Sequence, residues 1–287
     1  MKVSVITDST SSLPPEMYER YGIGMVPYYV HLPDRVARDM VDLTPAAFNA
    51  YMEALADDDE LPRTANPGPG EYAEAYLEAA RESNEIISFH MTSDGSGAYQ
   101  AAVLGRAMAL KERPELAIEV VDTRNVSMCH GWLTLEAARL AEQGAPLAMI
   151  VEQVRRFIPR TRMLQTADTL RYLYMGGRIG RSAHLVGSLL HIKPIISMED
   201  GVVVPVHVAR TRMGAYRRIA TLVEKAAGAG ARVKIALTHA AALADAETLR
   251  ELVEQVVRPV EVLMCDLSPA LTVHSGPGTV GLCYLLP

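Results

Sequence analysis

The residues best suited to chemistry lie in one turn of the chain, directly after the apolar run 86–91. Five small or polar residues, Thr92 to Ser96, follow that run, and Gly97 then opens a stretch of helix formers. This pattern predicts a strand, a tight turn and a helix, which leaves backbone N–H groups unpaired at the helix start. Such a turn favours an anion, a carboxylate or a phosphate, and the hydroxyls of Thr92, Ser93 and Ser96 would add neutral hydrogen bonds. An ordinary turn with Ser96 as helix cap fits the same residues.

The turn approaches two known motifs but matches neither. A phosphate-binding P-loop has a Lys-Ser/Thr pair after its glycines, whereas Gly97 is followed by Ala98 and Tyr99. A nucleophile elbow has glycines two residues before and two after its serine, whereas the glycines around Ser96 are its immediate neighbours. The sequence therefore favours a turn that holds an anion over one that attacks a substrate.

Two further residues are candidates for the same anion. Thr64 lies before a predicted helix and could offer one more hydroxyl. His274 precedes the glycine-rich turn 276–278, a rigid setting that distinguishes it from a random surface histidine. Taken alone, each of the two also fits a structural role.

Positive charge is concentrated in residues 168–218 of an otherwise acidic chain. The cations there are Arg171, Arg178, Arg181, Lys193, Arg210, Arg212, Arg217 and Arg218. Such a stretch either covers solvated helix faces or docks a phosphate-bearing or acidic partner. The glycines of 176–181 suggest a phosphate loop, but no strand is predicted before them, so the signal is weak.

Composition limits the class of protein. The 287 residues are enough for two domains, and a net charge of −6 argues against nucleic-acid binding. The three cysteines lack the spacing of a disulfide framework or a zinc site, so we expect them in the core and expect no metal. No stretch reaches the ~18 apolar residues of a membrane span, and the N-terminus does not read as a signal peptide. We therefore expect a cytoplasmic protein without stable membrane insertion.

Apolar runs alternate with helical patterns up to about residue 160, which predicts an α/β domain with a parallel sheet and helices on both faces. Strands are expected at 3–7, 26–32, 86–91 and 118–121. Beyond residue 160, the runs 192–198 and 202–208 flank an Asp-Gly turn, which predicts antiparallel pairing and hence a mixed sheet. We expect two domains, 1–160 and 161–287.

Taken in order, these segments resemble the DegV family along nearly the whole chain. The matching motifs are Ile6-Thr7-Asp8-Ser9, Thr64 to Pro67, residues 88–99, Gly176-Gly177-Arg178-Ile179, Ile192-Lys193-Pro194-Ile195, Arg210-Thr211, and His274 to Gly278. No single motif is decisive, but the ordered set is specific.

The resemblance implies a protein that binds one long-chain fatty acid, such as palmitate, stearate or oleate, between two α/β domains. It further implies a non-catalytic acyl-binding subunit of a bacterial fatty acid kinase, whose separate ATP-binding subunit phosphorylates the bound carboxyl group. By position, the family's carboxylate-binding residues correspond to Thr64, Ser96 and His274, with Ser93 and Gly97 beside them in the turn. The family's arginines for phosphoryl transfer or partner docking correspond to Arg178 and Arg210. No cofactor is implied.

The chain departs from the family pattern in two places. It has Thr64-Ala65-Asn66-Pro67 where the family usually has Thr-Ser-Gln-Pro, and Gly95-Ser96-Gly97-Ala98 in place of Leu-Ser-Gly-Thr. The anion-binding hydroxyls are kept, while the neighbours that shape the loops differ. A rival interpretation is a serine hydrolase or esterase, with Ser96 as nucleophile, His274 as base, and Asp8 or Asp94 to orient the histidine.

Overall fold

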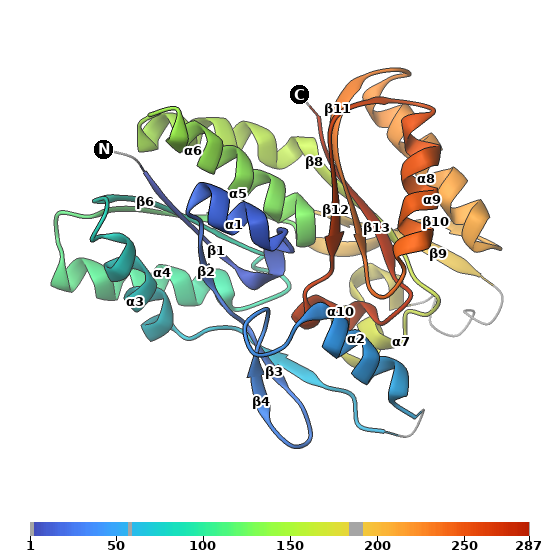
Figure 1. Ribbon diagram of the computed structural model, residues 1–287, viewed down its shortest axis with the longest axis horizontal. Coiled ribbons are helices and arrows are strands. Elements are labelled where there is room, and N and C mark those ends of the chain that lie inside the picture. Colours follow the sequence, from blue (N-terminus) through green and yellow to red (C-terminus); the bar gives the residue numbers. More distant parts are fainter. Residues whose placement is uncertain (1–2, 57–58, 184–191, 287) are drawn as a thin grey trace.

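A parallel sheet forms the N-terminal half of the molecule (Figure 1). The computed structural model describes residues 3–56, 59–183 and 192–286. The strand order is β2-β1-β6-β7, built from β1 (Ser4–Asp8), β2 (Gly24–Val26), β6 (Glu85–His90) and β7 (Ala117–Asp122), all parallel. Helices α3 (Pro69–Ala79) and α4 (Ala98–Glu112) pack on one face, and α1 (Pro15–Tyr21), α5 (Ser127–Glu142) and α6 (Leu147–Phe157) lie on the other. The predicted parallel sheet with helices on both faces is confirmed.

The C-terminal half holds a six-stranded sheet of order β10-β9-β8-β13-β11-β12. Its strands are β8 (Thr161–Thr166), β9 (Lys193–Glu199), β10 (Val202–Ala209), β11 (Arg232–His239), β12 (Arg258–Asp266) and β13 (Val280–Leu285). Only β11 and β12 pair in parallel among these strands, so the sheet is mixed as predicted. Helices α8 (Arg212–Ala227) and α9 (Leu243–Glu254) cover one face.

The turn between β9 and β10 has the predicted Asp-Gly form. Asp200 and Gly201 both adopt positive φ, 51° and 82°, as a tight hairpin turn requires. Strands β8 and β13 have no counterpart among the predicted strands, although β13 lies in the middle of the sheet.

Helix α5 joins the two large sheets. Its Trp132 is fully buried, and the indole Nε1 donates a hydrogen bond to the backbone carbonyl of Cys283 on β13 at 3.3 Å. The same apolar cluster contains Val5 of the parallel sheet and Met163 of the mixed sheet. Cys129, Cys265 and Cys283 are free and buried, as expected. The division of the chain at residue 160 stays a prediction.

The strand predicted over 26–32 is wrong as a single element. Residues 24–26 form β2 of the parallel sheet, whereas Tyr29–His31 form β3 of a separate three-stranded sheet, β4-β3-β5. Pro27 lies between them, and because proline has no N–H to donate, it ends the first pairing and turns the chain. Strands β4 (Val36–Arg38) and β5 (Arg63–Ala65) complete this small sheet, so Thr64 lies on a strand and not in a loop.

Short helices attach the small sheet to the C-terminal half. Helix α10 (Pro269–Ser275) packs against α2 (Pro45–Ala54), α7 (Arg171–Met175) and the small sheet. Its first turn is fixed by buried groups from the N-terminal half: Asp39 Oδ1 accepts from the Ala270 N–H at 3.1 Å, and Ser12 Oγ accepts from the Ser268 N–H at 3.3 Å. Helix α10 is therefore held by both halves of the chain. None of the helices in the described ranges combines the length and the apolarity that a bilayer crossing requires.

Candidate functional site

Four of the residues singled out from the sequence line one small cavity between the two halves. Thr64, Ser96, His274 and Arg178 surround about 70 Å³, together with Tyr28 and other residues. This volume exceeds the room that a single water needs, about 10–15 Å³, by several fold. We call it the head cavity. Residues from β5, the turn before α4, α10 and the loop after α7 meet here, so the chain assembles it from four distant segments.

Thr64 and His274 are hydrogen-bonded to each other across the head cavity. Thr64 Oγ1 lies 2.8 Å from His274 Nε2, while His274 Nδ1 has no hydrogen-bond partner in the described part of the chain. Burial and the nearby Arg178 guanidinium lower the pKa of His274 to about 4, so the imidazole is neutral at pH 7. In the Nε2–H tautomer the histidine donates to Thr64, and the threonine O–H is then free to donate to an anion.

Ser96 is positioned by Tyr28 and by the start of α4. Its Oγ lies 2.7 Å from the Tyr28 hydroxyl and accepts from the Ala98 N–H at 3.3 Å. Tyr28 is buried, and burial raises the pKa of its hydroxyl well above the usual value, so it stays protonated. When Tyr28 donates to Ser96, the serine O–H is left to donate into the head cavity. Gly97 is the N-cap of α4 and packs against Asn66, where an added Cβ would lie 3.1 Å from Oδ1.

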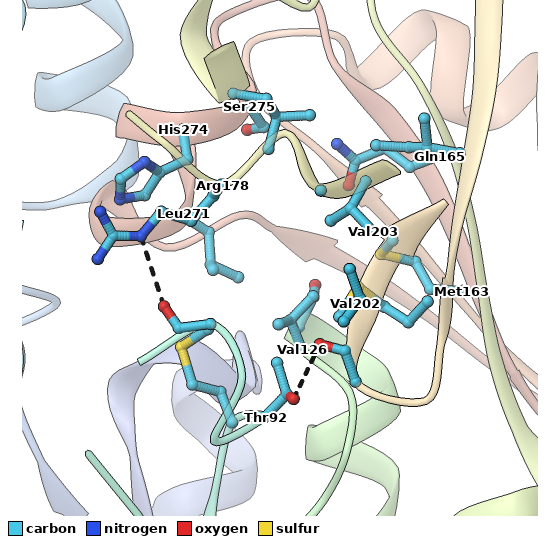
Figure 2. Close-up of a pocket in the computed structure, with 18 of the residues that line it drawn as sticks. Thr92, Val126, Met163, Gln165, Arg178, Val202, Val203, Leu271, His274 and Ser275 are labelled. Atoms are coloured by element: carbon cyan, nitrogen blue, oxygen red, sulfur yellow. Dashed lines mark hydrogen bonds between the residues drawn. The ribbon is translucent and has the colours of Figure 1, made fainter. Parts of the chain in front are cut away.

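Arg178 brings a fixed positive charge to the head cavity. Its Nε donates to the Gly95 carbonyl at 3.4 Å (Figure 2), and its Nη1 donates to the Gly176 carbonyl at 2.7 Å. These backbone acceptors hold the guanidinium but do not neutralise it, and no carboxylate pairs with it among the described residues. The site can therefore balance one negative charge on a ligand.

Two glycines allow α7 and α10 to approach closely beside the head cavity. A Cβ added to Gly176 would overlap His274 Nδ1 and lie 3.0 Å from Cε1, and one added to Gly276 would overlap the Tyr172 ring. Gly276 also has a positive φ of 78°. This close contact with His274 gives Gly176 a packing role, while the phosphate loop suggested by the glycines of 176–181 stays a prediction.

A larger, mostly apolar pocket of about 330 Å³ adjoins the head cavity and shares Arg178, His274, Leu271, Met91 and Gly95 with it. Its other walls are Val126 on the N-terminal side and side chains of the mixed sheet. These sheet residues are Met163, Gln165, Ile196, Met198 and Val203. In Figure 2, His274 and Arg178 lie at one end of the view and Gln165 and Met163 at the other. Three methionines, Met91, Met163 and Met198, are among its lining residues, and their adaptable side chains suit a flexible ligand.

The hairpin turn of the mixed sheet docks on the loops of the parallel sheet. Thr92 Oγ1 donates to the Gly201 carbonyl at 3.0 Å (Figure 2), and Arg124, which hydrogen-bonds to the Asp200 carbonyl, forms an ion pair with Asp94 at 3.0 Å. The Thr92 hydroxyl, one of the three expected to face an anion, therefore joins the two sheets.

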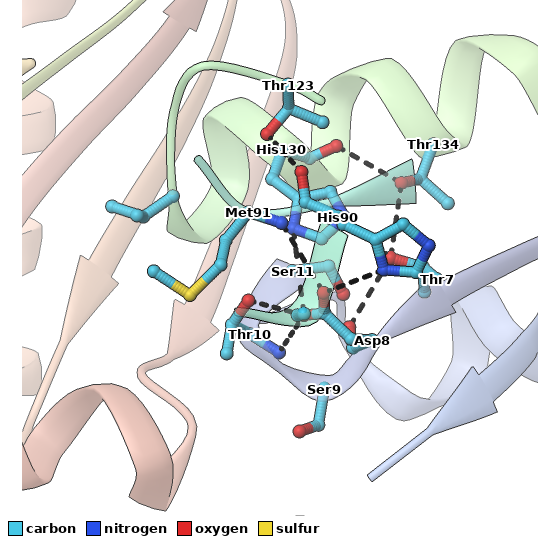
Figure 3. Close-up of polar contacts among 12 residues, drawn as sticks. Thr7, Asp8, Ser9, Thr10, Ser11, His90, Met91, Thr123, His130 and Thr134 are labelled. Atoms are coloured by element: carbon cyan, nitrogen blue, oxygen red, sulfur yellow. Dashed lines mark hydrogen bonds and ion pairs between the residues drawn. The ribbon is translucent and has the colours of Figure 1, made fainter. Parts of the chain in front are cut away.

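A buried polar network supports the loops from behind (Figure 3). The Asp8 carboxylate accepts from the Thr10 N–H at 3.0 Å and lies 3.3 Å from His90 Nδ1, and all three residues are buried. His130 Nε2 is 2.7 Å from Thr7 Oγ1, and burial lowers the pKa of His130 to about 4. The network fixes the turn after β1.

The structure places the other predicted residues as follows. Ser93 donates to Asp122 Oδ2 at 2.6 Å, and Asp122 also accepts from the Arg124 N–H, so Asp122 caps the turn after β7. Arg210 is exposed after β10 and is not among the residues that line the head cavity or the apolar pocket. Of these two arginines, Arg178 therefore lines the head cavity and Arg210 does not. Much of the basic stretch is neutralised, since Lys193 and Arg212 both pair with Asp168.

The hydrolase constellation is not favoured by this geometry. Ser96 bonds to Tyr28 and not to His274, whose Nε2 faces Thr64. The two proposed orienting carboxylates are engaged elsewhere, Asp8 with His90 and Asp94 with Arg124.

Fold and site together define an α/β protein that contains a parallel and a mixed sheet, with a polar, cationic head cavity that adjoins an apolar pocket. The sequence matches the family described as "Uncharacterised protein, DegV family" over residues 2–286. This chain belongs to the DegV family.

Known relatives resemble the chain over its full length. A DegV domain-containing protein of Caldanaerobacter subterraneus is 31% identical over 99% of this chain and 98% of its own. A solved DegV family protein of Thermus thermophilus, described as fatty acid binding, is 29% identical, with a TM-score of 0.90 and full coverage of both chains. DegV of Bacillus subtilis, described as a fatty acid binding protein, is 28% identical with a TM-score of 0.85, again over both whole chains.

Proposed function

We propose that this protein binds one long-chain fatty acid, with its carboxylate in the head cavity and its chain in the apolar pocket. The observation that carries the proposal is the convergence of Thr64, Ser96, His274 and Arg178 on one cavity that adjoins a mostly apolar one. The descriptions of the Thermus thermophilus and Bacillus subtilis proteins as fatty acid binding support it. The ligands we expect are acids such as palmitate, stearate or oleate.

The chemistry of the head cavity suits a carboxylate. Burying a carboxylate is costly unless donors and a counter-charge compensate it. Here two hydroxyl donors, Thr64 and Ser96, the start of α4 and the guanidinium of Arg178 are available. At about 0.8 kcal/mol per buried methylene, fourteen methylenes contribute roughly 11 kcal/mol as an upper bound before the costs of association.

The proposal extends to a partner. In this proposal, the protein presents the carboxyl group of the bound fatty acid to an ATP-binding kinase subunit, which converts it to an acyl-phosphate. This chain itself supplies no complete active site. A second cavity of about 360 Å³ supports this, because Thr64, Arg178 and His274 line both it and the head cavity. A phosphate donor could approach the carboxyl group from that side without entering the apolar pocket. Arg178 would then balance charge on the transferring phosphate.

The decisive experiment compares a fatty acid with its methyl ester on delipidated protein. We expect palmitate to bind and methyl palmitate to bind far more weakly, because the ester cannot use the head cavity's charge. Thr64→Val should reduce the preference for the acid. The matched control is Thr221→Val, which should keep the preference, because the exposed Thr221 hydroxyl donates only to the Arg217 carbonyl within α8. Equal affinity of the wild-type protein for acid and ester would rule out the carboxylate site.

The partner is tested separately. The loaded protein is incubated with ATP and the ATP-binding kinase subunit, and acyl-phosphate is trapped with hydroxylamine. Product that requires both proteins supports the proposal. Tight fatty-acid binding without any trapped product would refute the kinase role while leaving fatty-acid binding intact.

A further inference from the structure

Seven polar side chains from the described parts of the chain line the 330 Å³ pocket. Four of them are already assigned, Arg178 and His274 to the head cavity and Thr92 and Asp94 to the docking of the hairpin turn, and the other three are Gln165, Ser127 and Ser275. Each of these three is more than nine-tenths buried, with exposed fractions of 7%, 1% and 7%. A plain alkyl chain offers no partner to any of them. Buried polar groups are normally hydrogen-bonded, so their presence in a lipid pocket needs a physical reason.

Gln165 faces the pocket because of strand alternation. Met163 and Gln165 lie two residues apart on β8 and both line the pocket, whereas Leu164 between them packs in the cluster under α8 and α9. The register pairs Gln165 with Ile196 of β9, another pocket residue. The Gln165 amide makes no side-chain hydrogen bond to any residue in the described ranges, and Gln165 is one of the side chains that line the pocket (Figure 2), so its donors and its acceptor are available to a ligand there.

Two serines that line the same pocket also lack a partner. Ser127 Oγ and Ser275 Oγ are both buried and lack a hydrogen-bond partner within the described part of the chain. Ser127 opens α5 with a positive φ of 54°, an unusual conformation for a residue that is not glycine. Ser275 follows His274 on α10, and in Figure 2 it lies between His274 and Gln165. The polar groups thus extend from the head cavity toward the far end of the pocket.

We infer that this pocket is built for an oxygenated acyl chain, a long-chain fatty acid that carries a hydroxyl group along its length, and that Gln165 is the residue that selects it. This inference rests on the proposed fatty-acid function and names its substrate class. A chain hydroxyl both donates and accepts, so it can pair with the Gln165 amide and with an unpartnered serine at once. An unsubstituted chain would displace water from the amide without forming a hydrogen bond in its place. A site that hydrogen-bonds a substrate hydroxyl therefore discriminates against the analogue that lacks this hydroxyl.

The test measures binding of four acids of equal length to delipidated wild-type protein: stearate, oleate, 10-hydroxystearate and 12-hydroxystearate. We expect at least one hydroxystearate to bind about tenfold more tightly than stearate, the gain of one hydrogen bond to a buried amide. Oleate controls for shape, because its double bond bends the chain without adding a comparable hydrogen-bonding group. It should bind like stearate.

Two variants assign the effect to the amide. Gln165→Leu keeps the approximate size of the side chain and should abolish the hydroxystearate preference while strengthening stearate binding. Met163→Leu, on the same strand and in the same pocket, removes no polar group and should preserve the preference. Thermal melting of both variants checks that the fold is kept.

Three results would overturn the inference. The first is that neither hydroxystearate outcompetes stearate in the wild-type protein, as expected if a trapped water satisfies the amide. Oleate could show the same advantage as the hydroxystearates, which would mean that the pocket selects shape. Gln165→Leu could change the affinities of all four acids by the same factor. Each of these leaves fatty-acid binding in place, whereas failure of all four acids to bind would refute the proposed function as well.

Discussion

Gly176→Ala tests whether the position of His274 determines carboxylate affinity, without removing any polar group from the site. A Cβ at residue 176 would overlap Nδ1 of the imidazole and lie 3.0 Å from Cε1. Ordinary carbon contacts are about 3.5–4.0 Å, so the ring must move by roughly 0.5–1 Å. The Thr64–His274 hydrogen bond is 2.8 Å long, and a shift of about that size takes it to the limit of hydrogen-bond geometry, near 3.5 Å.

The expected loss follows from that hydrogen bond. With the imidazole displaced, the Thr64 hydroxyl is no longer oriented toward the ligand. A hydrogen bond to a charged group contributes about 1.5–3 kcal/mol, which corresponds to roughly a 10- to 100-fold weaker binding of palmitate. Methyl palmitate, which lacks the charge, should lose much less. The readout is the ratio of the two dissociation constants, measured by calorimetry or by displacement of a fluorescent fatty acid.

Gly177→Ala provides the matched control. Gly177 has a φ of +69° and no atom within 4 Å of an added Cβ, so alanine there strains the loop backbone without touching His274. We expect it to lower the melting temperature modestly and to keep the acid-to-ester ratio. If Gly176→Ala also keeps that ratio, the placement of His274 against α7 does not govern carboxylate binding and the reasoning fails.

Three further predictions concern charge, pH and the pocket. Arg178→Gln should weaken palmitate binding and allow the pKa of His274 to rise from about 4, whereas Arg210→Gln should leave lipid binding unchanged and reduce only kinase-coupled turnover. The pKa of His274 in the folded protein is about 4, below its ordinary value of 6.5, so the unfolded chain takes up a proton at this histidine first as the pH falls. The free energy of unfolding should therefore fall as the pH drops from 6.5 toward 4. Thermal melts should show a smaller fall for His274→Gln. Val203→Trp should fill the apolar pocket and abolish stearate binding while octanoate, if it binds the wild type, is retained.

Local patterns in the sequence predicted the polar turn before α4 and most of the strands of the parallel sheet. Strand β6, the polar turn and helix α4 occur where the run 86–91 and the residues after Gly97 placed them, because strand and helix periodicity are short-range signals. The hairpin at Asp200-Gly201 followed from its turn chemistry in the same way.

Local sequence patterns could not predict how the head cavity is assembled. Thr64 and His274 are separated by 210 positions and meet only because a small sheet, unrecognised in the sequence, packs against α10. Pro27 was the signal that the predicted strand 26–32 had to break. The prediction that Thr64 and His274 share a site came from the resemblance to a family and not from periodicity. Tyr28, Gly176 and Gln165 were missed since their roles depend on register and close packing, which one sequence does not reveal.

The placement of the site between the halves has an energetic consequence. Helix α10 is capped by Asp39 of the N-terminal half and carries His274, while the apolar pocket is walled by the mixed sheet on one side and by Met91 and Val126 on the other. A bound acid would therefore contact both halves at once, head and chain together. Any ligand that binds only the assembled state stabilises it by RT ln(1 + [L]/Kd), about 2.7 kcal/mol at a hundredfold excess over Kd. Lipid loading should thus hold the two halves together through the same residues that select the carboxylate, so that release of the acyl group and loosening of α10 are one event.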